Sequence, residues 1–203
     1  MRKLSVPLFW FLAVFAAGPA QAGDISSEYT DVDFEKGCTI VAIAGENDGD
    51  WADSVCTGWR GYPVFIFYGD ARESWHYGFY PPGEDRPPTE SFAGFNSAGN
   101  RIEWRIETDG EVSKPFATIH RWAVSKPEDS EKTTEVLVIE KVGAPDKQEG
   151  CVTGYVVASG DAKANEKARV LADARARAFR CGEDKPQRVE DGGLLPGLMV
   201  VEQ

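Results

Sequence analysis

The chain has 203 residues, with 22 Lys and Arg against 33 Asp and Glu and a net charge of −11 at neutral pH. This acidic balance argues against nucleic acid and anionic membrane surfaces as partners, because both require a basic surface. The length fits one ordinary domain with a substantial hydrophobic core.

The first segment predicts export. Residues 1–22 begin with Arg2 and Lys3, continue with an apolar run and end in an Ala-Gln-Ala motif at Ala22. This order is typical of a Sec signal peptide cleaved after Ala22. The apolar run is shorter than the roughly 20 residues that a membrane span needs. We therefore expect a periplasmic or secreted protein with no membrane span in the mature chain.

The next part of the chain predicts two hairpins. Strands over 38–44 and 51–59 flank Asp48-Gly49, and strands over 63–68 and 73–80 flank Gly69-Asp70. Both dipeptides are turn signals. The Pro-rich loop 81–90 ends this series.

Residues 101–107 alternate between apolar and charged side chains. Ile102, Trp104 and Ile106 fall on one face, and the other face carries Arg101, Glu103, Arg105 and Glu107. We expect the first face to be buried and the second to face water, as in an antiparallel sheet. Further strands are predicted over 115–124, 134–142 and 151–159.

One helix is predicted, over 162–180. Gly182 stands where a helix-ending glycine belongs, and a set of positions recurs every three or four residues: Ala164, Ala168, Leu171, Arg175 and Phe179. We expect its arginines to lie in solvent. The tail 183–203 is polar with a short apolar end that docks as an edge strand or stays loose.

These elements predict an α+β fold, in which an antiparallel β-rich meander, as a bent sheet or small barrel, carries one C-terminal helix. The predicted organisation is a signal peptide (1–22), a single domain (23–182) and the tail (183–203).

The four cysteines predict two disulfides. Cys38 and Cys56 lie at equal distances from the hairpin turn, which places them opposite one another. The strand that starts at Cys151 and the helix that ends near Cys181 have similar lengths, about 26 and 28 Å, so the returning helix brings these two cysteines together. The pairing 38–56 and 151–181 is favoured over the two alternatives.

The sequence contains no established catalytic or metal-binding motif. His76 and His120 are the candidates for acid–base catalysis, but nothing marks a nucleophile beside them, and surface or boundary histidines on strands are the more common case. Four acidic residues, Glu46, Asp48, Asp50 and Asp53, resemble a calcium-binding loop, although a solvated hairpin tip is the favoured interpretation. We expect no cofactor and no metal.

The strand over 73–80 is the candidate binding surface. It carries Trp75, His76, Tyr77, Phe79 and Tyr80 beside the Pro-rich loop, and aromatic residues often anchor interfaces. Packing in the core is the alternative for these side chains.

Several segments, including YTDVDFEKGC, PFATIHRW and ANEKARVLADARARAFRCG, resemble a family of small uncharacterised exported proteins of Gram-negative bacteria. The resemblance covers most of the chain from Tyr29 to Cys181, together with the cysteine framework. It implies export and disulfides and no assigned activity.

The sequence favours a non-enzymatic binding or interaction module that recognises a protein, peptide or envelope component. The alternatives are a periplasmic enzyme inhibitor, as of a cationic lysozyme, and a small hydrolase using His76 or His120.

Overall fold

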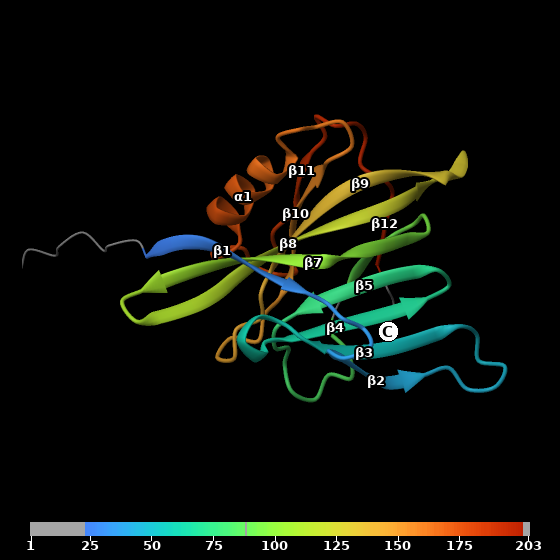
Figure 1. Cartoon of the computed structure of the whole chain (residues 1–203), viewed down its shortest axis with the longest axis horizontal. Coiled ribbons are helices and arrows are strands. Elements are labelled where there is room, and N and C mark those ends of the chain that lie inside the picture. Colours follow the sequence, from blue (N-terminus) through green and yellow to red (C-terminus); the bar gives the residue numbers. More distant parts are fainter. Residues whose placement is uncertain (1–22, 88, 201–203) are drawn as a thin grey trace, which may run out of the picture.

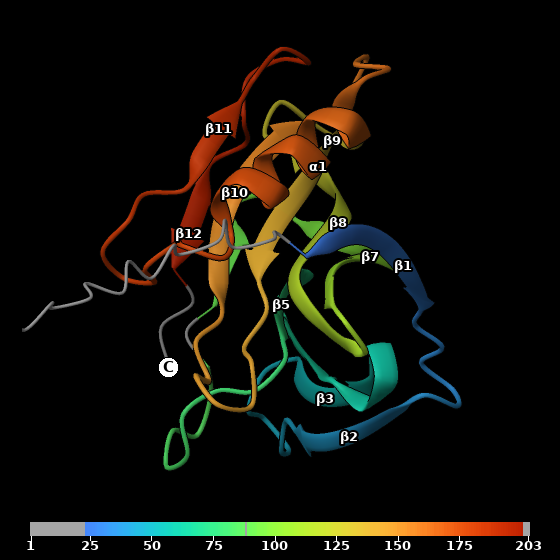
Figure 2. The same cartoon turned by 90° about the vertical axis from the view of Figure 1, so that its left-hand side faces the viewer.

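The computed structural model describes residues 23–87 and 89–200, and it has three layers (Figures 1 and 2). The larger sheet has the order β1 (Asp24–Asp31), β7 (Asn96–Asp109), β8 (Val112–Lys126), β9 (Asp129–Lys141), β10 (Cys151–Val157), β11 (Gln187–Val189). The smaller sheet has the order β2 (Cys38–Ile43), β3 (Trp51–Thr57), β4 (Pro63–Gly69), β5 (Arg72–Tyr77). Helix α1 (Ala164–Arg175) covers the larger sheet on the side away from the smaller one, and β6 (Glu90–Phe92) pairs with β12 (Leu198–Val200).

The predicted β-rich α+β fold with one helix near the C-terminus and two disulfides is confirmed, and the sheets do not close into a barrel. Neighbouring strands are antiparallel except for β10 and β11, which are parallel. The described part of the tail, 183–200, pairs with other strands, because it supplies both β11 and β12.

The prediction for residues 101–107 in β7 is confirmed for one face of the strand and wrong for part of the other face. Ile102, Trp104 and Ile106 are buried between the two sheets, as expected. The opposite face does not simply face water, because Glu103 and Arg105 are buried under α1. They form ion pairs with side chains of the helix, which local sequence does not reveal.

Two of these ion pairs tie α1 to β7. Arg169 donates to both carboxylate oxygens of Glu103 (2.6 and 3.1 Å), and Arg105 donates to both oxygens of Asp173 (2.8 and 2.7 Å). Such bidentate pairs are the strongest geometry for these groups. Arg169, which we expected in solvent, is therefore part of the docking surface of the helix.

The helix is shorter than the predicted span 162–180. It ends at Arg175, and turns continue the chain towards Cys181. Ala164, Ala168 and Leu171 pack on the sheet as the spacing predicts, and Leu171 meets β10 where Gly154 leaves room. A side chain at position 154 would clash with Leu171.

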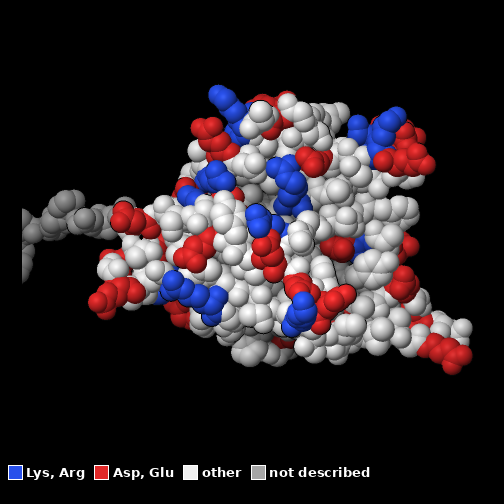
Figure 3. All heavy atoms as spheres, viewed as in Figure 1, with Lys and Arg blue, Asp and Glu red and all other residues white. Residues whose placement is uncertain are grey.

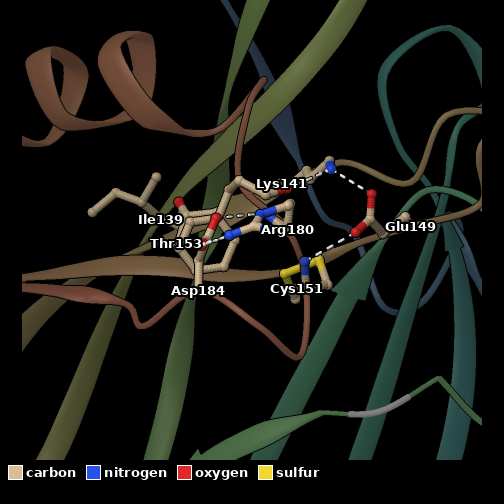
Figure 4. Close-up of a disulfide and its surroundings, with 9 residues drawn as sticks. Ile139, Lys141, Glu149, Cys151, Thr153, Arg180 and Asp184 are labelled. Atoms are coloured by element: carbon tan, nitrogen blue, oxygen red, sulfur yellow. Dashed lines mark hydrogen bonds and ion pairs between the residues drawn. A yellow bond between two sulfur atoms is a disulfide. The ribbon is translucent and has the colours of Figure 1, made fainter.

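Both disulfides have the predicted pairing. Cys38 lies directly opposite Cys56 across β2 and β3, and Cys151 joins Cys181 with a Cα–Cα distance of 5.8 Å. Beside the second bridge, Lys141 donates to Glu149 (2.5 Å), whose other oxygen accepts the Cys181 N–H (2.9 Å; Figure 4). The hydrogen bond from Lys141 lowers the pKa of the Glu149 carboxyl. This network fixes the chain where the helix returns to the sheet.

Two disulfides fit a protein of an oxidising compartment. Within the described ranges, no helix has the length and apolar character needed to cross a membrane. The predicted signal peptide, residues 1–22, lies outside the described residues.

Replacing Cys151 and Cys181 together with alanine should lower the free energy of unfolding by about 3 to 4 kcal/mol, because the bridge closes a chain segment with a separation of 30 residues. Urea unfolding of the oxidised and variant proteins measures this difference. Equal stability of the two proteins would contradict the role of the bridge in holding the end of the helix.

Candidate functional site

The strand predicted as a binding surface contributes mainly to the core. Trp75, His76 and Tyr77 are buried, and Phe79 and Tyr80 are half-buried. Trp75 and Tyr77 belong to the hydrophobic core between the sheets. These three side chains do not offer an exposed surface, because Trp75 and Tyr77 pack on the larger sheet and His76 lies beside the Phe65 and Tyr80 rings.

The two histidines lie in different layers. His120 faces the core between the sheets, whereas His76 follows the alternation of β5 to the opposite face, beside Phe65 and Tyr80 (6.2 and 6.0 Å between rings). Each is 1% exposed, and burial lowers the pKa of both to about 4. The structure therefore does not bring them together, nor does it open either one to a substrate.

The hydrogen bonds of His120 fix its tautomer. Nε2 lies 2.5 Å from the carbonyl oxygen of Gly99, which can only accept, so Nε2 carries the proton. Nδ1 is then the acceptor for the Tyr77 hydroxyl at 2.6 Å. Both nitrogens of the neutral ring are satisfied, and the ring joins β5 to β8.

Glu140 is a buried acid that sequence reasoning did not single out. It is buried and, with Glu90 and Tyr155, lines a small cavity. Burial raises the pKa of Glu140 well above its usual range, and the nearby Glu90 carboxylate raises it further. The Tyr155 hydroxyl donates to Glu90. Glu140 and Tyr155 are buried and Glu90 is half-buried, so the cluster lies at the edge of the core.

An open groove of about 570 Å³ lies at the end of the smaller sheet, and it is the candidate functional site. Three strands, the Pro-rich loop and the two-stranded sheet contribute to it. It is lined by Trp51, Asp53, Phe67, Tyr68, Gly69, Asp70, Arg72, Glu73, Ser74, Arg86, Ser91 and Met199.

Strand register produces the floor of the groove. Trp51 pairs with Gly69, and Gly69 pairs with Arg72, so these three positions form one row across β3, β4 and β5. The next row on the same face is Asp53 and Phe67, followed by Ser74. Since Gly69 has no side chain, space remains between the Trp51 ring and Arg72.

The Pro-rich loop supplies one wall. The Arg86 guanidinium forms an ion pair with Asp53 and lies over the Phe67 ring at 4.6 Å. Farther along, Thr89 donates to Ser74 (3.2 Å). The loop is thereby fixed on the outer face of the sheet.

The opposite end carries a second charged pair. Arg72 forms an ion pair with Asp70, donates to the Ala93 carbonyl (3.1 Å) and lies over the Phe95 ring at 5.1 Å. Tyr68 donates to Asp50 (3.3 Å). The groove therefore combines aromatic surface with two ion pairs, and its remaining charged residue, Glu73, accepts a hydrogen bond from the Trp75 ring N–H (2.9 Å).

The groove offers an aromatic ring, hydroxyl groups and ion-paired side chains to a ligand. The groove contains neither histidine nor cysteine among its lining residues. Among the residues that the structure describes, no group of three or more His, Cys, Asp or Glu is arranged to hold a metal ion. Of the four acidic residues considered for calcium, Asp53 faces the groove and pairs with Arg86, while Glu46, Asp48 and Asp50 are exposed at the hairpin tip.

Comparison with protein families, curated proteins and solved structures found no match for the chain. The resemblance to small exported proteins of Gram-negative bacteria stays a prediction.

Sequence reasoning missed Trp51, Arg72 and Arg86 as site residues. The register of the two hairpins places Trp51 and Arg72 on either side of Gly69. In the sequence, the turn dipeptides are the signals that indicate this register. No local pattern places Arg86 over Phe67, because this contact depends on the path of the Pro-rich loop.

His76→Leu should reduce the acid sensitivity of the protein. The folded-state pKa of about 4 lies below the ordinary 6.5, so the unfolded chain alone binds a proton between these values, and stability falls as pH drops through this window. Each buried histidine accounts for about 3 kcal/mol of this loss. Urea unfolding between pH 7 and 4 should show a shallower decline for the variant, and an unchanged decline would contradict the burial of a neutral ring.

Glu140→Gln should stabilise the protein near neutral pH. Because the folded-state pKa is raised, the carboxyl contributes its full stability below the ordinary pKa of about 4.5, and the wild type loses stability as pH rises above it. The advantage of the variant should therefore grow from pH 4.5 upwards in urea unfolding. The exposed Glu131→Gln on the same strand is the control and should show no such trend; a similar trend in both would contradict the assignment to Glu140.

Proposed function

We propose that this chain is an exported, non-enzymatic binding module that holds a neutral ligand in the groove lined by Trp51, Phe67, Tyr68, Arg72 and Arg86. The observation that carries this proposal is an open concave site with an aromatic floor and paired charges. Pockets with apolar walls and a few fixed polar groups are the usual form of a ligand site.

The pairing of the charges favours a neutral ligand. Arg86 is paired with Asp53, and Arg72 with Asp70, so an ionic ligand would compete with an existing partner. Hydroxyl and amide groups, in contrast, can hydrogen-bond to paired carboxylates and guanidinium groups without separating them.

The aromatic residues favour a ligand with a flat apolar face. Trp51 is half-buried and lies on the same face as Phe67 and Arg72, so its ring offers surface at the groove, whereas the Tyr68 side chain alternates to the other face of β4. A sugar ring combines an apolar C–H face with hydroxyl groups at its rim, and an aromatic ring offers a matching apolar surface. The proposed ligand class is a neutral glycan segment of the cell envelope.

The two alternatives have less support. An enzyme inhibitor would fit the acidic composition and the disulfide-bonded hairpin, but no feature of the groove favours it. The hydrolase alternative loses its basis, because His76 and His120 are both buried.

Gly69→Leu should weaken ligand binding in the groove at least about tenfold while the fold is kept. A Cβ at position 69 would lie 3.6 Å from the Trp51 Cβ, an ordinary contact, so the added side chain extends into the space between Trp51 and Arg72. Gly45→Leu, in the open β2–β3 loop, is the matched control.

Tryptophan fluorescence measures the binding. In protein without residues 1–22, which contain Trp10, the buried Trp59, Trp75, Trp104 and Trp122 leave Trp51 as the ring that acrylamide should mainly quench, and Trp51→Phe identifies its signal. Oligomers of N-acetylglucosamine should protect Trp51 in the wild type and in Gly45→Leu, with affinity at least about tenfold lower in Gly69→Leu. Equal protection in Gly69→Leu would place the ligand elsewhere, and no protection in the wild type would contradict a glycan ligand.

A further inference from the structure

Strand β2 forms an open edge of the smaller sheet. It pairs with β3 on one side, and it ends the strand order on the other (Figure 1). Its residues, Cys38–Ile43, include no charged residue and no proline, and its irregularity is a bulge at Val41. One edge strand of the larger sheet, β1, carries Asp24, Glu28 and Asp31 instead. Charges, prolines and bulges are the features that keep an edge strand from pairing, so β2 has only one of these protections.

The side chains of β2 extend the core face of the sheet into solvent. Ile40 lies in the row that continues through Ser54 and Ile66 to Trp75, and the last two are core residues. At the edge, however, Ile40 is 62% exposed and Ile43 is 66% exposed. A strand added beside β2 would cover both with its own apolar side chains.

The main chain of β2 also points outwards at defined positions. The Gly37 carbonyl accepts from Thr57, and the Ala44 N–H donates to Trp51, so these two positions face β3. Since alternate residues of an antiparallel strand face opposite sides, the N–H and C=O groups of Ile40 point away from β3. Ala44 faces β3, so by the same alternation the N–H and C=O groups of Ile43 point away from β3.

Acidic side chains flank this edge. The tip of the β2–β3 hairpin carries the exposed Glu46, Asp48 and Asp50, and Figure 3 shows acidic atoms gathered at this tip. At the other end of β2, Asp33 and Glu35 are exposed, and Lys36 is paired with Asp33 (3.6 Å). The apolar edge therefore lies between two acidic ends.

We propose that β2 binds an extended segment of a basic partner protein, with apolar residues at alternating positions and Lys or Arg at both ends. The segment adds a strand to the smaller sheet: main-chain hydrogen bonds form at Ile40 and Ile43, its apolar side chains cover both isoleucines, and its cations meet the acidic ends. This interaction goes beyond the groove, because it uses a different surface and a different class of ligand.

The charges disfavour a second copy of the chain as the occupant. In an antiparallel pair of β2 strands, the hairpin tip of one copy would lie beside residues 33–36 of the other. This contact sets Glu46, Asp48 and Asp50 against Asp33 and Glu35, and like charges in such a contact are unfavourable.

Two peptides of alternating valine and threonine test the proposal, one with lysine at both ends and one with glutamate. The lysine-ended peptide should bind at low salt and slow the hydrogen exchange of the Ile40 amide, measured by NMR. The glutamate-ended peptide should bind at least about tenfold more weakly, and added salt should reduce the difference.

Variants of the protein locate the site. Ile40→Pro removes the outward N–H, and Glu46→Gln with Asp48→Asn removes charge at the tip; each should weaken binding of the lysine-ended peptide, the first by at least about tenfold. If Ile40→Pro disturbs folding, Ile40→Lys tests the same edge. Val112→Lys, at an exposed apolar position in β8, is the control and should bind normally. Gly69→Leu should also bind normally, which separates this site from the groove.

Three results would overturn the proposal. The first is that the lysine-ended peptide leaves the Ile40 amide unprotected from hydrogen exchange. The second is that both peptides bind equally well. The third result is a dimer, detected by sedimentation, that the Ile40→Pro variant fails to form. That result would assign the edge to a second copy of the chain.

Discussion

The smaller sheet is attached to the larger one through an aromatic layer that centres on the hydrogen bond between Tyr77 and His120. The Trp75 ring meets His120 edge-on at 4.7 Å, and both lie in the core between the sheets. All the polar atoms of this contact are buried, and an unpaired group there would cost about 1 to 3 kcal/mol. The bond therefore fixes which face of β5 is turned inwards, and it favours a neutral His120 ring.

The surfaces left for function follow from this docking. Because the inner face of the smaller sheet is used for packing, a ligand can reach its outer face and its open edge. The Pro-rich loop covers part of the outer face through Arg86 and Phe67, and the uncovered part is the groove beside Trp51. The edge beside Ile40 remains unpaired because the chain leaves β2 by a hairpin and enters it from β1 of the other sheet. Through Trp75 and Tyr77, strand β5 therefore holds the smaller sheet in the orientation that leaves both sites accessible.

Much of the fold could be predicted from local patterns, and much of the site could not. The Asp-Gly turn and the spacing of Cys38 and Cys56 predicted a hairpin that the structure confirms, since strand register is a local property. Strand β1 was missed because its polar sequence becomes a strand only where β7 offers an edge. The burial of Glu103 was missed for a similar reason: its partner Arg169 is distant in sequence. The groove depends on contacts of the same long-range kind.

The most direct measurement is the NMR titration of His120 with nitrogen-15 labelling, because its ring reports on the contact between the sheets. We predict that His120 stays neutral, with its proton on Nε2, until the pH falls to about 4. A titration near the ordinary value of 6.5, or a proton on Nδ1, would contradict it. Such a result would mean that the ring is open to water and that the smaller sheet does not dock through Tyr77.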